Sequence, residues 1–287
     1  MSGSTQQRGL FAGVAGIDII YRMDDELPRK NGKKTVRDFE VQIGGPAAKA
    51  AMTCAALGGK AGLLTCIGDS MQGRWLKQEL AGMGIETIDL ARDQYSSPNI
   101  SAVFLDQAGG TRTVVSGQHP LDGIQWNGGP EEGYDYCLYD CNLPVLTPEI
   151  VSMLAERGIP LILDCGSWKQ SIEPALSYAE IAISSKVFRS PGGEDIFDLQ
   201  KKYEIPCAAR TNEGDPVEYS FPGEAGTVEV VCLKKGFTIG AGDVFHGAFC
   251  YYHRYLSQPI KEALRNAAEC ATGYVRDGKI KGEKDEF

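Results

Sequence analysis

Near the C-terminal end of the chain, three small residues lead directly into an acidic one, in the order Gly240–Ala241–Gly242–Asp243. An apolar stretch follows and predicts a helix that begins at this point. Small residues let the backbone approach a ligand closely, and the first N–H groups of a helix have no intrahelical partner. Those groups and the positive end of the helix dipole form a site for an anion such as a phosphate. Asp243 could then take a proton from a hydroxyl, or it could simply cap the helix.

A second glycine pair, Gly44–Gly45, precedes an alanine-rich segment nearer the start of the chain. The segment from Ala47 to Leu57 contains no internal glycine or proline and stops at Gly58–Gly59, which predicts a helix. Lys49 belongs to this motif. The chain therefore has two glycine-rich turns that each lead into a helix.

Short apolar runs alternate with helical segments along most of the chain. We expect strands at residues 10–15, 61–67, 135–139, 160–164, 178–184 and 205–210. We expect helices at residues 47–57, 75–84 and 147–158, the last with Thr147 as its N-cap and Pro148 at its first position. This alternation predicts a mostly parallel sheet covered on both faces, with ligands at the carboxyl ends of its strands.

Two segments, residues 36–43 and 100–106, instead alternate apolar with polar side chains, as half-exposed antiparallel strands do. Gly109–Gly110 predicts a hairpin turn that joins the second segment to residues 111–115. We interpret these segments as a small β-layer inserted into the α/β body, and so we expect one compact domain with a lid.

Composition narrows the possible functions. The chain has 287 residues, of which 43% are hydrophobic and 23% charged, and this excludes a disordered or fibrous protein. Its 29 basic and 38 acidic residues give a net charge of −9, which argues against a nucleic-acid or anionic-membrane partner. No run of eighteen apolar residues predicts a membrane span. Nine scattered cysteines without a Cys-x-x-Cys pair, and only three histidines, predict reduced core thiols in the cytoplasm and no zinc site.

The two glycine motifs, with Gly68–Asp69 between them, resemble the ribokinase-like (PfkB) family of carbohydrate kinases in that order. The resemblance covers roughly residues 10–276, which we expect to form a single domain, with its lid at about residues 19–43 and 98–117. Residues 1–9 then form a disordered leader and residues 277–287 a polar tail. The resemblance to this family implies a Rossmann-like three-layer α/β/α fold with a mostly parallel central sheet and a β-sheet lid. The local sequences around Pro46 and His246 also resemble those of the sulfofructose kinase branch.

The resemblance assigns roles to individual residues. It implies a catalytic base and an anion hole, formed by Asp243 and by Gly240, Ala241 and Gly242. It implies contacts to the sugar from Asp18, Gly44 and Gly45, and contacts to the nucleotide from Thr211, Gly214 and Asn266. Asp18 could instead be an exposed acid after a strand, and Asn266 an ordinary helix residue.

Several positions depart from the family pattern. Lys49 stands where the family has asparagine, and the family's Asn-x-x-Glu motif is absent near residues 184–187. The Thr-x-Gly-x-x-Gly motif is degraded at residues 209–214. Phe237 replaces an acid that the family links to a monovalent-cation site, so we expect a weak response to K⁺. The sequence assigns no metal ligands.

Three cations, Lys33, Lys49 and Arg112, fall near the expected sugar side. If they converge, they would suit an anionic substrate such as a sugar phosphate or sulfonate. Each could equally be a solvated side chain on the lid.

These observations predict an enzyme that uses ATP and Mg²⁺ to phosphorylate a hydroxyl of a sugar or sugar derivative. We also expect a homodimer formed through the lid. The alternatives are a kinase-derived sugar-binding protein with an eroded nucleotide site, and a nucleoside kinase. A nicotinamide oxidoreductase is disfavoured because no G-x-G-x-x-G follows the first strand.

Overall fold

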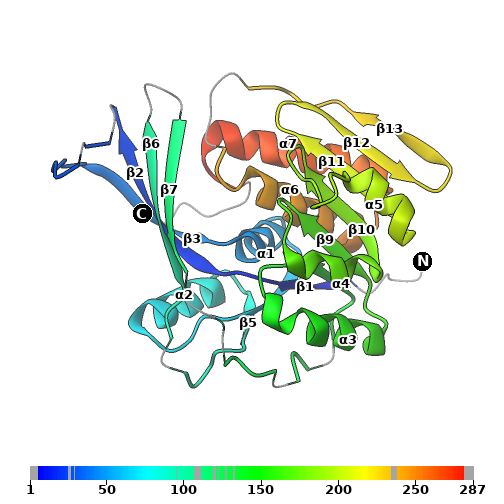
Figure 1. Ribbon diagram of the computed structural model, residues 1–287, viewed down its shortest axis with the longest axis horizontal. Coiled ribbons are helices and arrows are strands. Elements are labelled where there is room, and N and C mark those ends of the chain that lie inside the picture. The colour runs from blue at the N-terminus through cyan, green and yellow to red at the C-terminus, as the bar shows by residue number, and fades with distance from the viewer. Residues whose placement is uncertain are drawn as a thin grey trace.

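A nine-stranded sheet forms the centre of the body (Figure 1). This computed structural model describes residues 6–280, apart from 25–26, 29, 95, 107–110, 119–120, 122, 127, 132 and 234–237. In sheet order, the strands are β13 (Glu224–Val228), β12 (Asp215–Phe221), β11 (Cys207–Asn212), β10 (Ala179–Ser185), β9 (Leu161–Cys165), β8 (Tyr136–Tyr139), β1 (Arg8–Ala12), β4 (Lys60–Thr65) and β5 (Glu86–Asp89). Neighbouring strands are parallel from β11 to β5, and only β12 and β13 run antiparallel to their neighbours.

A separate four-stranded sheet is the lid, and Figure 1 shows it standing beside the body. Its strands, in order, are β3 (Asp38–Gly44), β2 (Gly16–Met23), β6 (Asn99–Asp106) and β7 (Thr111–Gly117). The alternating segments at residues 36–43 and 100–106 therefore do form lid strands, as the sequence predicted. The turn expected at Gly109–Gly110 lies outside the described residues.

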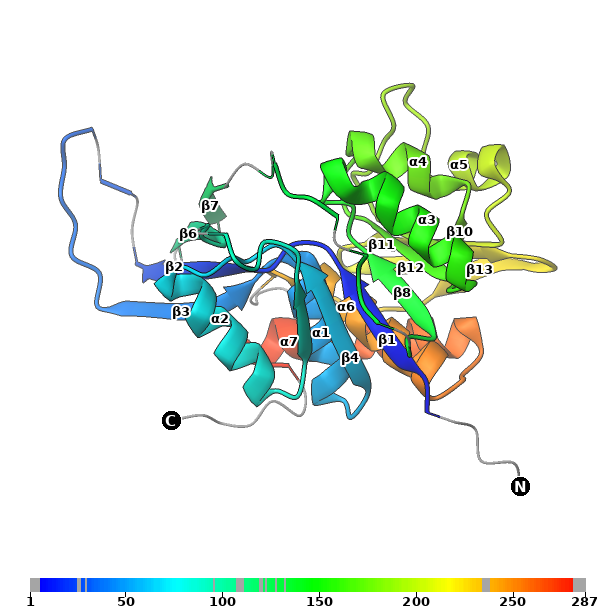
Figure 2. The same cartoon turned by 90° about the horizontal axis from the view of Figure 1, so that it is seen from below.

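Helices cover both faces of the large sheet, and this gives the three-layer fold that was expected (Figure 2). One face carries α1 (Pro46–Ala56), α6 (Ala241–Cys250) and α7 (Ile260–Asp277), and the other carries α3 (Thr147–Arg157), α4 (Glu173–Leu176) and α5 (Ile196–Tyr203). α2 (Met71–Gly82) lies next to β5 and the lid. Because side chains of a strand alternate between faces, Phe11 packs in the core beneath α1, while Leu10 and Ala12 pack in the core beneath α3.

One local prediction was wrong. Thr147 is the first residue of α3 rather than its N-cap, because a 3₁₀ turn at Pro144–Leu146 runs directly into the helix. The Thr147 hydroxyl hydrogen-bonds the carbonyl oxygen of Leu143 at 3.1 Å and the hydroxyl of Tyr139 at 2.6 Å. It therefore ties the start of α3 to β8 instead of capping it.

Within the described residues, we find no helix with both the length and the apolar character needed to cross a bilayer. All nine cysteines are free thiols, and only Cys232 is exposed.

Candidate active site

Close packing of α1 against α6 brings the two glycine motifs together. A Cβ atom added to Gly247 of α6 would lie only 2.8 Å from the side chain of Thr53 on α1, so only glycine allows this approach. α1 begins immediately after Gly45, and α6 begins immediately after Gly240. The two helix N-termini therefore share one region at the carboxyl ends of the central strands.

The N-terminus of α6 offers free backbone donors. Gly240 is its N-cap, with a φ of 80° that favours glycine. The N–H of Ala241 donates to the carbonyl oxygen of Thr238 at 3.3 Å. Those of Gly242 and Asp243 donate to no other group within the described residues. Two free amides at the positive end of a helix form a site for an anion.

Asp243 lies in the first turn of α6 beside these amides, and it is half-buried. Burial and the nearby carboxylate of Asp164 raise the pKa of Asp243 to about 7, although the ammonium of Lys49 opposes the rise. A carboxyl group with a pKa near neutrality is matched to accepting a proton at physiological pH.

Two further acids, Asp140 and Asp164, follow β8 and end β9 respectively, and both are buried. His246 of α6 lies between Asp164 and the start of its own helix. Its Nε2 is 3.6 Å from Asp164 Oδ1, and its Nδ1 is 2.7 Å from the carbonyl oxygen of Gly242. This histidine thus connects the anion site to the central sheet.

Asp140 holds the first glycine motif in place, a role that sequence reasoning missed. Its carboxylate accepts hydrogen bonds from the backbone N–H groups of Val14 at 2.9 Å and Ala47 at 3.2 Å. It also accepts one from the N–H of Asn142 at 2.8 Å. It therefore joins the loop after β1 to the start of α1. The only signal in the sequence is an acid directly after an apolar strand, which by itself does not indicate this role.

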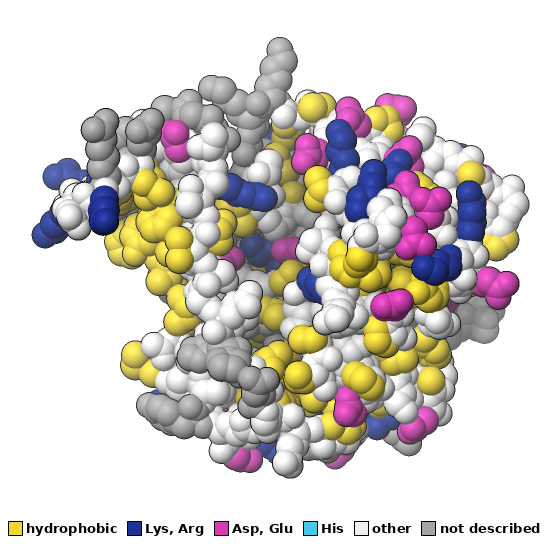
Figure 3. Space-filling view, in the orientation of Figure 1, with side chains coloured by type: hydrophobic (Ala, Val, Ile, Leu, Met, Phe, Trp, Pro, Cys, Tyr) yellow, Lys and Arg dark blue, Asp and Glu magenta, His cyan; other side chains and the backbone are white. Residues whose placement is uncertain are grey.

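Asp18 of β2 faces the same region from the lid. A Cβ atom on Gly44 would lie within 2.6 Å of all three carboxyl atoms of Asp18, so the glycine makes room for this carboxylate. Burial raises the pKa of Asp18, against the ammonium of Lys49 and a hydrogen bond to Ser101. We call the space bounded by Asp18, Gly44, Lys49 and Asp243 the acceptor seat. Figure 3 shows a hollow between lid and body, with both basic and acidic side chains inside it.

A cleft of about 670 Å³ opens on the other side of the α6 N-terminus. Residues of the β9–β10 ends, the β11–β12 hairpin, α6 and α7 line it, among them Gly166, Lys186, Thr211, Gly214, Gly242 and Ala271. Thr211 and Gly214, the residues predicted on the nucleotide side, thus share one cleft with Ala241 and Gly242 of the anion site.

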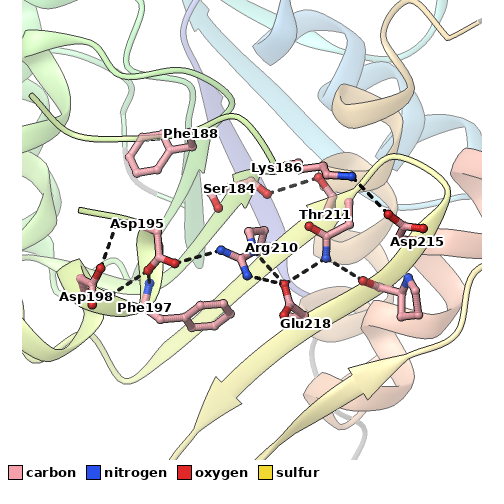
Figure 4. A network of polar contacts seen from close by, with 12 residues as sticks. Ser184, Lys186, Phe188, Asp195, Phe197, Asp198, Arg210, Thr211, Asp215 and Glu218 are labelled. Carbon is pink, nitrogen blue, oxygen red and sulfur yellow. Dashed lines mark hydrogen bonds and ion pairs between the residues drawn. The ribbon is translucent and has the colours of Figure 1, made fainter. Parts of the chain in front are cut away.

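Ion pairs brace the β11–β12 hairpin that borders this cleft (Figure 4). Arg210 reaches Asp195 at 2.9 Å and Glu218 at 2.6 Å, and its guanidinium lies 5.2 Å from the ring centre of Phe197. Lys186, directly after β10, lies 3.2 Å from Asp215 at the start of β12. Because Lys186 lines the cleft and is half exposed, its ammonium can contact a ligand phosphate there.

The structure places the other four predicted site residues, Asn266, Lys33, Arg112 and Lys49, at separate positions. Asn266 of α7 donates to the side-chain oxygen of Gln258 at 2.7 Å and does not line the cleft. Lys33 is exposed in the segment before β3, whereas Arg112 of β7 lines the cleft. Lys49 is buried, so the structure does not bring the three cations together. Within the described residues, no cluster of three or more acidic, histidine or cysteine side chains could hold a metal ion.

Comparison with known proteins agrees with this geometry. Residues 12–126 match the profile described as pfkB family carbohydrate kinase. This part of the chain is therefore similar to the carbohydrate kinases of the PfkB family. The chain is 25% identical over 256 residues to the ATP-dependent ribose-1-phosphate kinase of Halopiger xanaduensis, covering 84% of this chain and 83% of the relative.

Solved structures show the same fold. The microbiome-derived acarbose kinase has a TM-score of 0.79 at 18% identity, covering 98% of this chain and 96% of that chain. The ribokinase of Cryptococcus neoformans, solved in complex with ADP, has a TM-score of 0.72 at 18% identity, covering 97% of this chain and 96% of that chain. The ribokinase-like fold is thereby confirmed, while the resemblance to the sulfofructose kinase branch stays a prediction.

Proposed function

We propose that the protein transfers the γ-phosphoryl group of ATP to a hydroxyl of a sugar or sugar derivative, with Asp243 as the general base. One observation carries this proposal. Asp243, whose pKa is raised to about 7, sits beside two free amides between the acceptor seat and the cleft. If Asp243 only capped α6, its position between the acceptor seat and the cleft would serve no purpose.

The reaction follows from this arrangement. With ATP in the cleft and the hydroxyl in the acceptor seat, Asp243 removes the hydroxyl proton, and the oxygen attacks the γ-phosphorus in line. The bond from the γ-phosphorus to the bridging oxygen breaks, ADP leaves, and Asp243 releases its proton to solvent. The amides of Gly242 and Asp243 stabilise the negative charge on the transferring group.

Mg²⁺ would enter this site with the nucleotide. Mg²⁺ needs only one or two carboxylates when phosphates supply its other ligands, and the cleft provides the carboxylates of Glu213 and Asp215. When bound, Mg²⁺ would neutralise phosphate charge. The proposal predicts that chelating Mg²⁺ stops turnover.

The acceptor in this proposal includes anionic sugars. The Halopiger xanaduensis relative is named for an acceptor that carries a phosphate. On the lid, Lys33 is an exposed cation that could meet an anionic group away from the reacting hydroxyl, and Arg112 is exposed where it lines the cleft.

An ADP-release assay with ribose, ribose 1-phosphate and adenosine tests the function and separates the sugar from the nucleoside alternative. We expect turnover with a sugar and none in a matched reaction that contains EDTA. A kinase-derived sugar-binding protein is the second candidate, because the nucleotide motifs depart from the family at residues 184–187 and 209–214. Such a protein would show no thermal stabilisation by ATP and Mg²⁺ while still being stabilised by a sugar.

The rate should depend on pH through Asp243. Because the base must be ionised, kcat/KM should rise with pH and level off above about pH 7. Burial is the main cause of the raised pKa of Asp243, and the charge of Asp164 adds to it, so Asp164→Asn should move this acidic limb to lower pH. A pH–rate profile measures both, and a limb that Asp164→Asn leaves unchanged would exclude Asp243 as the titrating base.

We also propose that a second copy of the chain covers the outer face of the lid. Phe39, Val41 and Val115 have exposed fractions of 59%, 48% and 61%, and Tyr21 stacks between Phe39 and Phe104 on the same face. Such an apolar face is typical of a subunit interface. Light scattering should give twice the mass of 31.0 kDa, and Val115→Lys should reduce the mass to that of one copy.

The nine free thiols fit a reducing compartment, so we propose that the protein is located in the cytoplasm. Cell fractionation tests this location.

A further inference from the structure

Lys49 is an unusual lysine. It lies in the first turn of α1 with 4% of its surface exposed, and within the described residues its ammonium makes no hydrogen bond or ion pair. Removing an ammonium from water without a direct partner costs free energy, so it needs compensation from nearby charges.

The ammonium lies at the reaction centre. A Cβ atom on Gly240 would be 2.7 Å from Lys49 Nζ, so the lysine reaches the residue that caps α6. Burial raises the pKa of Asp18 on the lid and of Asp243 on α6, and the charge of Lys49 opposes the rise of both. The ring centre of Tyr274 on α7 lies 5.9 Å from Nζ, and Glu40 on β3 also feels the charge.

We propose that Lys49 is a positioning residue of the reaction centre, whose buried ammonium balances the charges of Asp18 and Asp243 across the acceptor seat. This inference rests on the proposed function, because it assigns Lys49 to the same seat. It differs from the expectation that Lys49 binds an anionic group of the substrate.

The charges around the seat favour this role. When Asp18 and Asp243 are both ionised, two carboxylates and one ammonium give the seat a net negative charge, which disfavours an anionic group of the substrate there. Lys33 and Arg112 are exposed and Arg112 lines the cleft, whereas Lys49 is buried. Without Lys49, the carboxylates of Asp164 and Asp140 would still act on Asp243, and among the described groups that act on it only His246 would oppose them. Removing the ammonium should therefore make Asp243 harder to ionise.

A double-mutant cycle on stability tests this without any turnover. Lys49→Met removes the charge and keeps most of the apolar stem, and Asp243→Asn removes the carboxylate. At pH 8.5, where Asp243 is ionised, Lys49→Met should lower the Tm more in the parent than in Asp243→Asn. At pH 5, where Asp243 is protonated, Lys49→Met should lower the Tm by the same amount in the parent and in Asp243→Asn. Met52→Ala, on the same helix and also buried, is the control and should act equally in both backgrounds at both pH values.

The kinetic test uses ATP with ribose and with ribose 1-phosphate. Lys49→Met should move the acidic limb of kcat/KM to higher pH, so the value at pH 6 falls by about tenfold or more while the plateau changes less. The fold-loss should be the same for both acceptors. Lys49→Arg keeps the charge, so the acidic limb of its kcat/KM profile should lie close to the pH of the parental limb.

The proposal would be overturned if Lys49→Met lowered the Tm equally in the parent and in Asp243→Asn at pH 8.5. It would also be overturned if the difference between the two backgrounds were the same at pH 8.5 and at pH 5. A loss confined to ribose 1-phosphate would do the same, because it would assign Lys49 to the substrate anion. The Tm cycle needs only the folded protein, so its result does not depend on whether the proposed kinase reaction is observed.

Discussion

Replacement of Asp243 by asparagine should reduce phosphoryl transfer by about 10²–10⁴-fold. Asparagine has nearly the same shape and can still occupy the first turn of α6, but it cannot accept the hydroxyl proton. Steady-state kcat, measured by ADP release at pH 8, gives the size of the loss. Asp93→Asn, which neutralises an exposed acid at a positive φ that asparagine tolerates, is the matched control and should retain parental activity.

The same variant should fold, and its stability should carry a pH signature. The folded-state pKa of Asp243 is raised from 3.8 to about 7, so the parent loses stability as pH rises between these values. Asparagine does not titrate. The Tm of Asp243→Asn relative to the parent should therefore rise from about pH 4 to pH 7 and then stay level. A loss of turnover below about tenfold in a folded variant would remove Asp243 from the role of base.

The second large effect is expected at Gly44. In Gly44→Ala the new Cβ would lie 2.5 Å from Asp18 Cγ, a distance that real Cβ contacts do not reach, so the carboxylate must leave the acceptor seat. A hydrogen bond to a charged group contributes about 1.5–3 kcal/mol, which converts to a loss of about ten- to a hundredfold in kcat/KM for the acceptor. The KM for ATP should stay within about twofold.

Controls separate displacement of Asp18 from general damage. Gly82 on α2 has open space at its Cβ position, so Gly82→Ala should leave both substrates unaffected. Asp18→Ala should reproduce the loss seen in Gly44→Ala, and the double variant should lose little more than either single variant. If Asp18→Ala were harmless while Gly44→Ala was not, the carboxylate of Asp18 would not bind the acceptor.

Local patterns in the sequence predicted the main elements of the fold. The strands beginning near residues 61, 160 and 205 are short apolar runs bounded by turn residues, and such runs carry a strong signal. The β12–β13 hairpin was missed because Asp215–Phe221 includes a proline and several polar side chains. As the antiparallel edge of the sheet, it needs less continuous hydrophobicity than a central strand.

The chemistry of α6 could be predicted because its residues are consecutive. Gly240, Gly242 and Asp243 act within one turn, so their spacing in the sequence equals their spacing in space. Asp140 and Asp164 act on this site from the ends of β8 and β9, and their relation to Asp243 depends on strand order. No sequence spacing records strand order, so these acids could not be found beforehand.

The direction in which side chains point is the second feature that the sequence could not predict. Lys49 and Arg112 were grouped because both fall near motifs of the expected sugar side, but one is buried against Gly240 and the other lines the cleft. Asn266 likewise lies on the predicted helix, yet its amide bonds Gln258. Rotamers and packing decide such directions, and neither is encoded by composition or periodicity.

Label transfer from ATP tests the central claim most directly. Wild-type protein is incubated with Mg²⁺, ATP labelled in its γ-phosphate, and ribose or ribose 1-phosphate, and the acceptor is analysed by mass spectrometry. The account predicts that the label appears on an acceptor hydroxyl with the wild-type protein, and that Asp243→Asn slows its appearance at least a hundredfold. Label that appears on the acceptor at equal rates with both proteins, or that is released only as inorganic phosphate, would contradict it.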